Sequence, residues 1–184
     1  GTASVRRRAL LLHHRPDLDI GLLRGNVNTR IAALQDGQFD AIILAVAGLR
    51  RLSLDVDYAP LDLAVMPPSA SQGALAIQTR DRDDPRSLAV MAASADLGCA
   101  KTTTEVTAER ALLGRLDGSC HTPIAASATC DENGRLHLDG MILSEDGRQA
   151  FRDRIDGFGS DATQLGETLA DQLLGAAGGR HFLA

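Results

Sequence analysis

The stretch AIILAV, residues 41–46, is a continuous apolar run bounded by Asp40 and Gly48. Such runs are typical of strands that are covered on both faces, as the strands of a parallel sheet are. A shorter extended run, IGLL at residues 20–23, and a helical pattern at residues 27–35 precede it. The alternation of strand and helix predicts an α/β fold for the N-terminal part of the chain.

The sequence begins with GTAS, directly before a helical pattern at residues 5–14. In an α/β fold a strand normally leads into such a helix, and no apolar run precedes this one. We therefore expect residues 1–69 to form an incomplete α/β domain. Either its upstream strand belongs to a segment outside this polypeptide, or that edge of the sheet is left open.

The pattern changes at residues 70–84, which hold a predicted strand at residues 75–79 and the charged stretch RDRDDP. We interpret this segment as a linker. We predict that residues 85–184 form a small α+β domain. Two helical patterns come first, and short predicted strands joined by the hairpin signals ENG and EDG follow them. The predicted helices are residues 85–95, 102–116 and 162–176, and the predicted three-stranded antiparallel sheet is formed by residues 124–129, 135–143 and 149–155.

The composition narrows the classes of function. The 184 residues include 19 Lys and Arg against 24 Asp and Glu, a net charge of −5, which does not favour a nucleic-acid surface. No apolar run approaches the ~18 residues of a membrane span, and the first residues lack a signal-peptide pattern, so we expect a cytoplasmic protein. Cys99, Cys120 and Cys130 form no CxxC pair, so we expect neither a disulfide framework nor a metal site.

Two clusters of arginine lie at predicted helix starts. GTASVRR places the Ser4 hydroxyl with Arg6 and Arg7 at the first start, and RGNVNTR places Arg24 and Arg30 around the second. Helix N-termini attract anions, and guanidinium groups bind carboxylates or phosphates through two parallel hydrogen bonds. The two clusters together predict a polyanionic ligand. The alternative is that these arginines are solvated or paired with nearby aspartates.

The stretch LDGSCHTP, residues 116–123, places Cys120 on a loop between a predicted helix and a predicted strand. A buried, inert cysteine is the usual alternative, but the polar Asp117 and Ser119 argue against deep burial. A catalytic pair with His121 is not favoured, because adjacent side chains on an extended segment point to opposite sides. Cys120 is therefore predicted to be an accessible thiol.

Six motifs in this order closely resemble hydroxymethylbilane synthase, also called porphobilinogen deaminase, over essentially the whole chain. They are GTASVRR, RGNVNTR, AIILAVAGLRRL, SQGALAIQTR, TAERALLGRL and LDGSCHTPIA. The resemblance implies an enzyme of tetrapyrrole biosynthesis that polymerises four porphobilinogens with release of ammonia. It also implies a covalent dipyrromethane cofactor, fixed by a thioether to Cys120. The implied partners are porphobilinogen and the growing polypyrrole chain, with no nucleic acid and no membrane, in a protein that is monomeric.

The resemblance also implies a set of binding residues. Those expected to contact the carboxylates of the cofactor or substrate are Ser4, Arg6, Arg7, Arg24, Gly25, Asn26 and Arg30. Ala47 and Gln72 match positions that line the same cleft. By the same resemblance, residues 1–69 are part of a periplasmic-binding-protein-like second domain, residues 70–84 return to the first domain, and residues 85–184 attach the cofactor.

Several departures from the family pattern qualify these expectations. Ala3 stands where the family usually has a serine, and Ser71 and Ser119 stand where it usually has glycines. Most of the first domain has no counterpart here, including the aspartate that acts as general acid and base. We therefore expect this chain alone to be inactive unless that domain is supplied separately. The alternative hypothesis is a non-catalytic module that binds a carboxylate or phosphate ligand, for which Cys120 would be dispensable.

Overall fold

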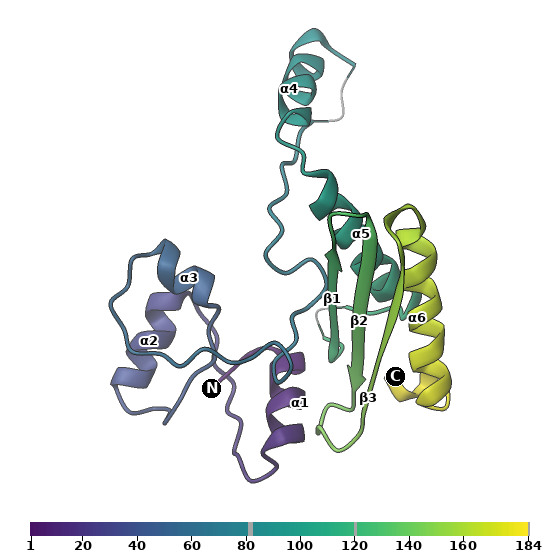
Figure 1. Ribbon diagram of the computed structural model, residues 1–184. Coiled ribbons are helices and arrows are strands. Elements are labelled where there is room, and N and C mark those ends of the chain that lie inside the picture. Colours follow the sequence, from purple (N-terminus) through teal and green to yellow (C-terminus); the bar gives the residue numbers. More distant parts are fainter. Residues whose placement is uncertain (81–82, 120, 184) are drawn as a thin grey trace.

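The computed structural model describes residues 1–80, 83–119 and 121–183 (Figure 1). The C-terminal part is built on a three-stranded antiparallel sheet in the order β1-β2-β3. Its strands are β1 (Ile124–Cys130), β2 (Arg135–Leu143) and β3 (Ala150–Phe158). The hairpins fall at the two predicted turn signals, so the α+β prediction for this part of the chain is confirmed.

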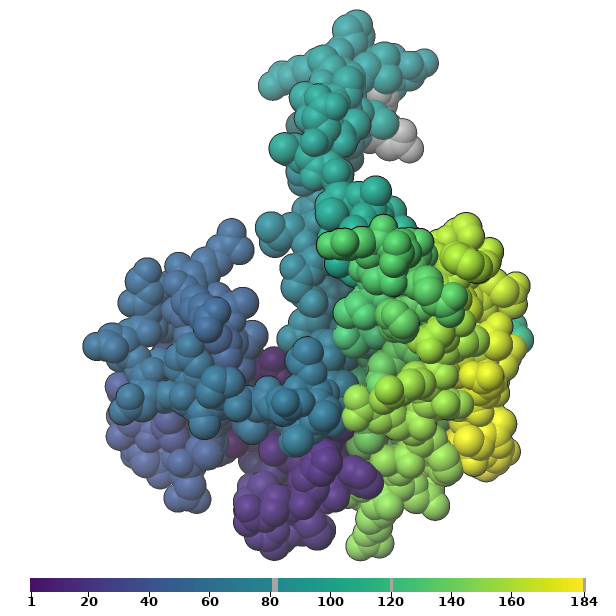
Figure 2. All heavy atoms as spheres, in the orientation of Figure 1, coloured from purple at the N-terminus to yellow at the C-terminus, as the bar shows by residue number. Residues whose placement is uncertain are grey.

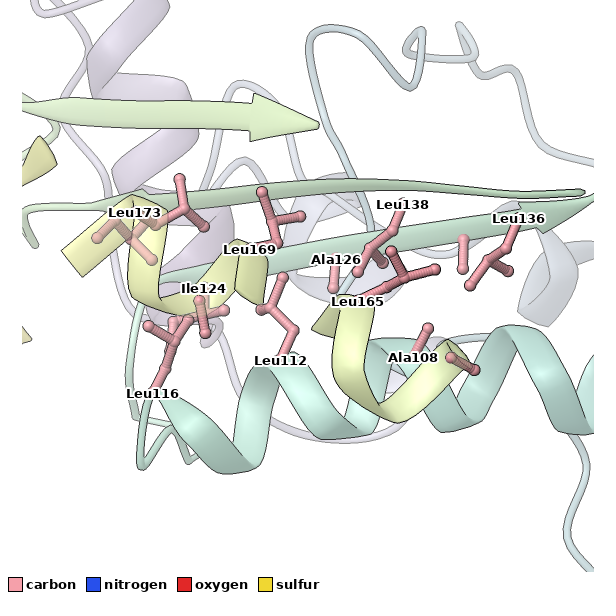
Figure 3. Close-up of a cluster of buried hydrophobic side chains, with 14 of the residues drawn as sticks. Ala108, Leu112, Leu116, Ile124, Ala126, Leu136, Leu138, Leu165, Leu169 and Leu173 are labelled. Atoms are coloured by element: carbon pink, nitrogen blue, oxygen red, sulfur yellow. The ribbon is translucent and has the colours of Figure 1, made fainter. Parts of the chain in front are cut away.

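Two long helices cover one face of this sheet (Figure 3). They are α5 (Ala100–Arg115), which begins two residues before its predicted start, and α6 (Ala162–Ala176), which matches its prediction. Leu112, Leu169 and Leu173 point from the helices towards the sheet and are at most 1% exposed. Burying each such leucine contributes about 1.5–3 kcal/mol, so this layer holds the C-terminal part together.

The opposite face of the sheet contacts the N-terminal part through α1 (Val5–His14). Side chains alternate along a strand, so Met141 and Leu143 of β2 point away from α5 and α6. They form a second buried cluster with Ala9 and Leu10 of α1 and Ala125 of β1. The sheet is therefore sandwiched at this end, which explains why the last four residues of β2 are all buried.

The remaining N-terminal helices are α2 (Val27–Gln35) and the short α3 (Val46–Arg51). Side chains cap the starts of α1 and α2: the Ser4 hydroxyl accepts a hydrogen bond from the Arg7 backbone N–H at 3.3 Å, and the Asn26 Oδ1 accepts one from the Thr29 N–H at 2.9 Å. Each cap satisfies a backbone donor at the first turn of its helix, which stabilises the helix.

The strands predicted at residues 20–23, 41–46 and 75–79 are wrong, because no described residue before Ile124 is in a strand. Short ladder contacts take the place of a sheet. Thr2 N donates to Gly21 O and Leu23 N donates to Thr2 O; likewise the Gly1 amino group donates to Ala41 O and Ile43 N donates to Gly1 O. Both pairs have the bonding pattern of parallel strands. The sequence carries the strand pattern, but a strand also needs a neighbouring segment to pair with, and here the pairing stops after these contacts.

The segment between the two parts projects from both of them (Figure 2). It includes α4 (Pro85–Ala95), at the position predicted for a helix, where Asp84 caps the helix start. Leu75 is 84% exposed and Ile77 is 58% exposed, and Met91 of α4 is exposed as well. Two short 3-10 helices complete the described elements, η1 (Gly159–Asp161) before α6 and η2 (Arg180–Leu183) after it. No helix in the described part of the chain is long and apolar enough to cross a membrane.

Candidate functional site

The starts of α1 and α2 lie at the same edge of the N-terminal part. Residues 1–2 pair in parallel with residues 21–23, so the two segments run side by side into their helices. Burial lowers the pKa of Arg7 in α1, and the positive charge of Arg30, in the first turns of α2, lowers it further. The predicted clusters GTASVRR and RGNVNTR therefore meet in space, as a shared ligand would require.

A cavity of about 720 Å³ opens beside Arg7. Its wall is largely apolar and comes from residues 41–46, parts of α2 and α3, and the segment at residues 55–66. Asp40, Asp55 and Asp57 also line it. Gln72, from a distant motif, lines the same cavity. The Arg7 Nη1 donates to the Ile43 carbonyl at 3.1 Å, which fixes the guanidinium at the wall of this cavity.

Arg7 and Arg30 are cations of the site, together with the exposed Arg24 on its rim. Within the described residues neither forms an ion pair with a carboxylate. Arg30 donates from Nε to the Gly25 carbonyl at 2.8 Å, which leaves its two terminal nitrogens available. Two neighbouring guanidinium groups repel each other, so an anion between them is stabilised by both.

Arg6 has a different environment from Arg7. It is 7% exposed, donates through Nη1 to the Pro67 carbonyl, and donates through Nη2 to Gln72 Oε1 at 3.0 Å. Burial lowers its pKa to about 10, which still leaves it charged at neutral pH. These contacts fasten α1 to the stretch that carries Gln72. The contacts of Arg6 are therefore those of a structural residue, and its predicted role as a carboxylate ligand stays a prediction.

The other predicted residues occupy the rim of the site. Arg24 is exposed, and Gly25 has a φ of 111°, which a residue with a side chain rarely adopts. Ala47 is exposed in the first turn of α3, next to Val46, which lines the cavity. The hydroxyl of Ser4 and the side chain of Asn26 are engaged as helix caps, so both act first on the local backbone.

Cys120 lies outside the described residues, so the structure does not test its predicted accessibility. The residues around it form a polar loop at the entry to β1. Ser119 and His121 are exposed, and the Ser119 N–H donates to the Thr122 hydroxyl at 3.1 Å. Asp117 has a φ of 56°, which turns the chain sharply after α5.

One residue that the sequence analysis did not single out is Glu109 of α5. It is 9% exposed, and its carboxyl accepts backbone hydrogen bonds from Ser71 at 2.6 Å and Ala128 at 2.7 Å. Burial raises the pKa of this carboxyl. Its spacing in the sequence could have indicated its burial, because Glu109 lies three residues before Leu112 and seven before Leu116, on the apolar face of the same helical pattern.

Comparisons with known proteins show the family of the chain. Residues 1–87 match the family model "Porphobilinogen deaminase, dipyromethane cofactor binding domain", and residues 103–175 match "Porphobilinogen deaminase, C-terminal domain". Porphobilinogen deaminases of Trichlorobacter lovleyi and Pelobacter propionicus are 48% and 47% identical over 184 residues, which is all of this chain and 57% of each relative. That of Nitrobacter hamburgensis is 44% identical over 99% of this chain and 56% of the relative.

The chain thus spans a little over half the length of the curated relatives that it matches. The two matched models together reach from the arginine clusters of the N-terminal part to α6 of the C-terminal part. Both models carry the same family name, and the cofactor named in the first is the dipyrromethane that the motifs imply. The chain belongs to the porphobilinogen deaminase family.

Proposed function

We propose that this chain is the carboxy-terminal portion of a hydroxymethylbilane synthase. The complete enzyme joins four porphobilinogen molecules head to tail, with loss of four molecules of ammonia, on a dipyrromethane primer. The observation that carries the proposal is that Arg7 and Gln72, from two separate motifs, line one cavity. We also propose that it acts in the cytoplasm as a monomer.

The chemistry of the ligand fits this site. Each pyrrole carries an acetate and a propionate, so the growing chain is a string of carboxylates on an apolar backbone. Arg7 and Arg30 provide two adjacent guanidinium groups for the carboxylates, and the apolar wall at residues 41–46 suits the rings. When bound, the dipyrromethane supplies the pyrrole carbon to which the next unit is joined.

We propose that Cys120 holds the cofactor. The exposed Ser119 and His121 on either side of it support an accessible thiol. Attachment from preformed hydroxymethylbilane balances as a substitution. The sulfur forms a bond to the hydroxymethyl carbon, the carbon–oxygen bond breaks, and the thiol proton leaves with the hydroxyl as water.

Intact mass spectrometry tests this attachment. After incubation with preformed hydroxymethylbilane, the purified chain should gain the mass of that compound less one water. The Cys120→Ser variant should gain nothing, whereas Cys99→Ser, which removes an exposed thiol elsewhere, should behave as the parent chain does. A mass gain that persists in Cys120→Ser and disappears in Cys99→Ser would place the attachment on Cys99 and contradict the proposal for Cys120.

The same experiment separates the alternative function. A module that only binds carboxylates or phosphates would gain no mass. It would also bind its ligand equally well after Cys120→Ala. That pair of results would replace the enzyme assignment with the binding module.

We further propose that these 184 residues alone do not turn over porphobilinogen, because the resemblance places the family's proton donor in the part of the relatives that they do not match. Positioned proton transfer typically contributes ~10² to 10⁴ in rate. Adding the first domain of a relative as a separate polypeptide should restore hydroxymethylbilane production, measured after its oxidation to porphyrin. Turnover by the purified chain without that addition would contradict this proposal.

A further inference from the structure

The buried carboxyl of Glu109 joins three elements that are distant in sequence. Its Oε1 accepts a hydrogen bond from Ala128 N of β1, and its Oε2 accepts one from Ser71 N of the linker, at 2.7 and 2.6 Å. Glu109 itself lies in α5. A single side chain therefore connects the C-terminal core to the chain segment that carries Gln72.

That segment, residues 67–72, is here named the 67–72 loop. It is also held from the N-terminal side, because Arg6 donates to the Pro67 carbonyl and to Gln72 Oε1. From the sheet, Ala126 N donates to the Pro68 carbonyl at 3.0 Å. The Gln72 side chain additionally accepts from the Ser69 N–H and hydroxyl, both at 3.2 Å. The loop is thus fixed between α1 on one side and α5 with β1 on the other.

Ser71 has an unfavourable conformation within this loop. Its φ is 63°, in the left-handed region that residues with a side chain rarely adopt. Its hydroxyl is buried and has no hydrogen-bond partner among the described residues. A residue persists in such a conformation only when its surroundings impose it. The bond from the Ser71 N–H to Glu109 is one of the contacts that hold this backbone, together with the turn bonds from Gln72 N to Ser69 O and from Ala74 N to Ser71 O.

We propose that Glu109 is a positioning residue that holds the 67–72 loop so that Gln72 lines the cavity beside Arg7. Glu109 acts through the backbone of Ser71 and does not line the cavity itself. The effect on ligand binding rests on the proposed function, whereas the effect on the loop does not. The C-terminal domain thereby controls the shape of a binding site in the N-terminal part.

The chain offers a matched control for this proposal. Glu105 lies one turn earlier in α5, and its carboxyl accepts a backbone hydrogen bond from Cys130 of β1 at 2.8 Å. Unlike Glu109, it has no hydrogen bond to the 67–72 loop among the described residues. Both Glu105→Gln and Glu109→Gln remove a carboxyl group from the same helix. Glu105→Gln keeps the one acceptor oxygen that the bond from Cys130 needs, whereas Glu109→Gln has one acceptor oxygen for two donors, Ser71 and Ala128.

Hydrogen–deuterium exchange tests the loop directly. In Glu109→Gln the single amide oxygen has to serve both donors, so the bond from Ser71 is lost or weakened, and exchange in peptides covering residues 69–74 should rise about tenfold or more. Glu105→Gln should leave those peptides unchanged. Protection of α6 serves as the reference for folding. Glu109→Asp, whose shorter side chain cannot span both donors, should show the same rise and replaces Glu109→Gln if that variant does not fold.

A double-mutant cycle tests the route through Gln72. The half-saturating concentration of hydroxymethylbilane for mass gain should rise about fivefold or more in Glu109→Gln, and should not rise further when Glu109→Gln is added to Gln72→Ala. Unchanged exchange of residues 69–74 in Glu109→Gln, an equal rise in Glu105→Gln, or additive effects in the cycle would each overturn the proposal. If the parent chain gains no mass, the proposed function fails, and the exchange result alone decides whether Glu109 holds the loop.

Discussion

Gly166 of α6 crosses α5 directly over Ala108, so closely that no side chain fits between the two helices. A Cβ built on Gly166 would overlap the Ala108 carbonyl oxygen and would lie 2.8 Å from the backbone nitrogen of Leu112. The obstructing atoms are backbone, which cannot move without separating the helices. The contact between α5 and α6 therefore depends on this glycine.

Gly166→Ala should destabilise the protein by about 1–3 kcal/mol, because the extra methyl group forces α6 away from α5. Gly175→Ala is the matched control in the same helix, since a Cβ there would meet no atom within 4 Å. This control should be neutral or stabilise by up to about 1 kcal/mol through helix propensity. Urea unfolding followed by circular dichroism measures both, and equal stabilities of the two variants would contradict the predicted crossing.

Gly147 at the tip of the β2–β3 hairpin gives a second prediction. A Cβ on Gly147 would lie 2.5 Å from the Ala9 carbonyl oxygen and 2.6 Å from His13 N, both in α1. Gly134, in the β1–β2 turn, has a similar φ (76° against 71°) but an open environment. Gly147→Ala should therefore increase hydrogen exchange throughout α1, whereas Gly134→Ala should affect only its own turn. Unchanged exchange of α1 in Gly147→Ala would show that the hairpin does not dock there.

The raised pKa of Glu109 predicts a pH dependence of stability. Burial is the main cause of the shift, and it favours the protonated carboxyl in the folded state. The stabilisation that this shift gives to the folded state is fully present below the pKa of Glu109 in the unfolded chain, about 4.3. It is lost as the pH rises through the higher pKa of Glu109 in the folded chain. The free energy of unfolding of the parent chain, minus that of Glu109→Gln, should therefore fall as the pH is raised from 4 towards neutrality.

The stability of Glu109→Gln has to be subtracted because several exposed carboxyls have a lowered pKa and therefore stabilise the protein more as the pH rises. Hydrogen bonds lower the pKa of Asp84, Asp131 and Asp171, so their contributions grow as the pH rises. These groups are present in both proteins and cancel in the difference. A difference that increases with pH would mean that the two backbone bonds outweigh the burial of Glu109.

Arg6 and Arg7 are neighbours with separable effects. Arg6→Ala removes the Arg6 donor from the Pro67 carbonyl and leaves Gln72 Oε1 with its two donors from Ser69 alone, which should cost about 1.5–3 kcal/mol of stability. Arg7→Ala removes one hydrogen bond to a carbonyl at the cavity wall and should weaken hydroxymethylbilane uptake with a smaller loss of stability. Urea unfolding and the mass-gain assay, applied to both variants, resolve the two roles. Equal losses in both assays would contradict this division.

Except for α3, which no pattern predicted, the α-helices of the described chain were predictable because their signals are local. Ser4 and Asn26 cap the helices that follow them, and Asp84 caps α4. The antiparallel sheet was predictable for a related reason, since each strand is joined to its partner by a short turn at Gly134 or Gly147. All of these interactions lie within a few residues of the pattern that predicts them.

The parallel strands failed as predictions because their partners are not local. The apolar run at residues 41–46 has the pattern of a buried strand, but it makes only two ladder bonds, to Gly1. The candidate site shows the same difference between local motifs, which the sequence reveals, and contacts between distant residues, which it does not. The arginine motifs indicated where a ligand could bind, whereas only the three-dimensional arrangement separates the buried Arg6 from the cavity-lining Arg7 and reveals the link from Glu109 to Ser71.

The exposed stretch around Leu75 and Ile77 has a practical consequence. Its backbone is in no strand of the described chain, and its large apolar side chains face water. An uncovered extended segment of this kind is a template on which a second molecule can add a strand, which is the first step of aggregation. We expect this stretch to limit the concentration at which the purified polypeptide stays dispersed, and a lysine in place of Ile77 to raise that limit.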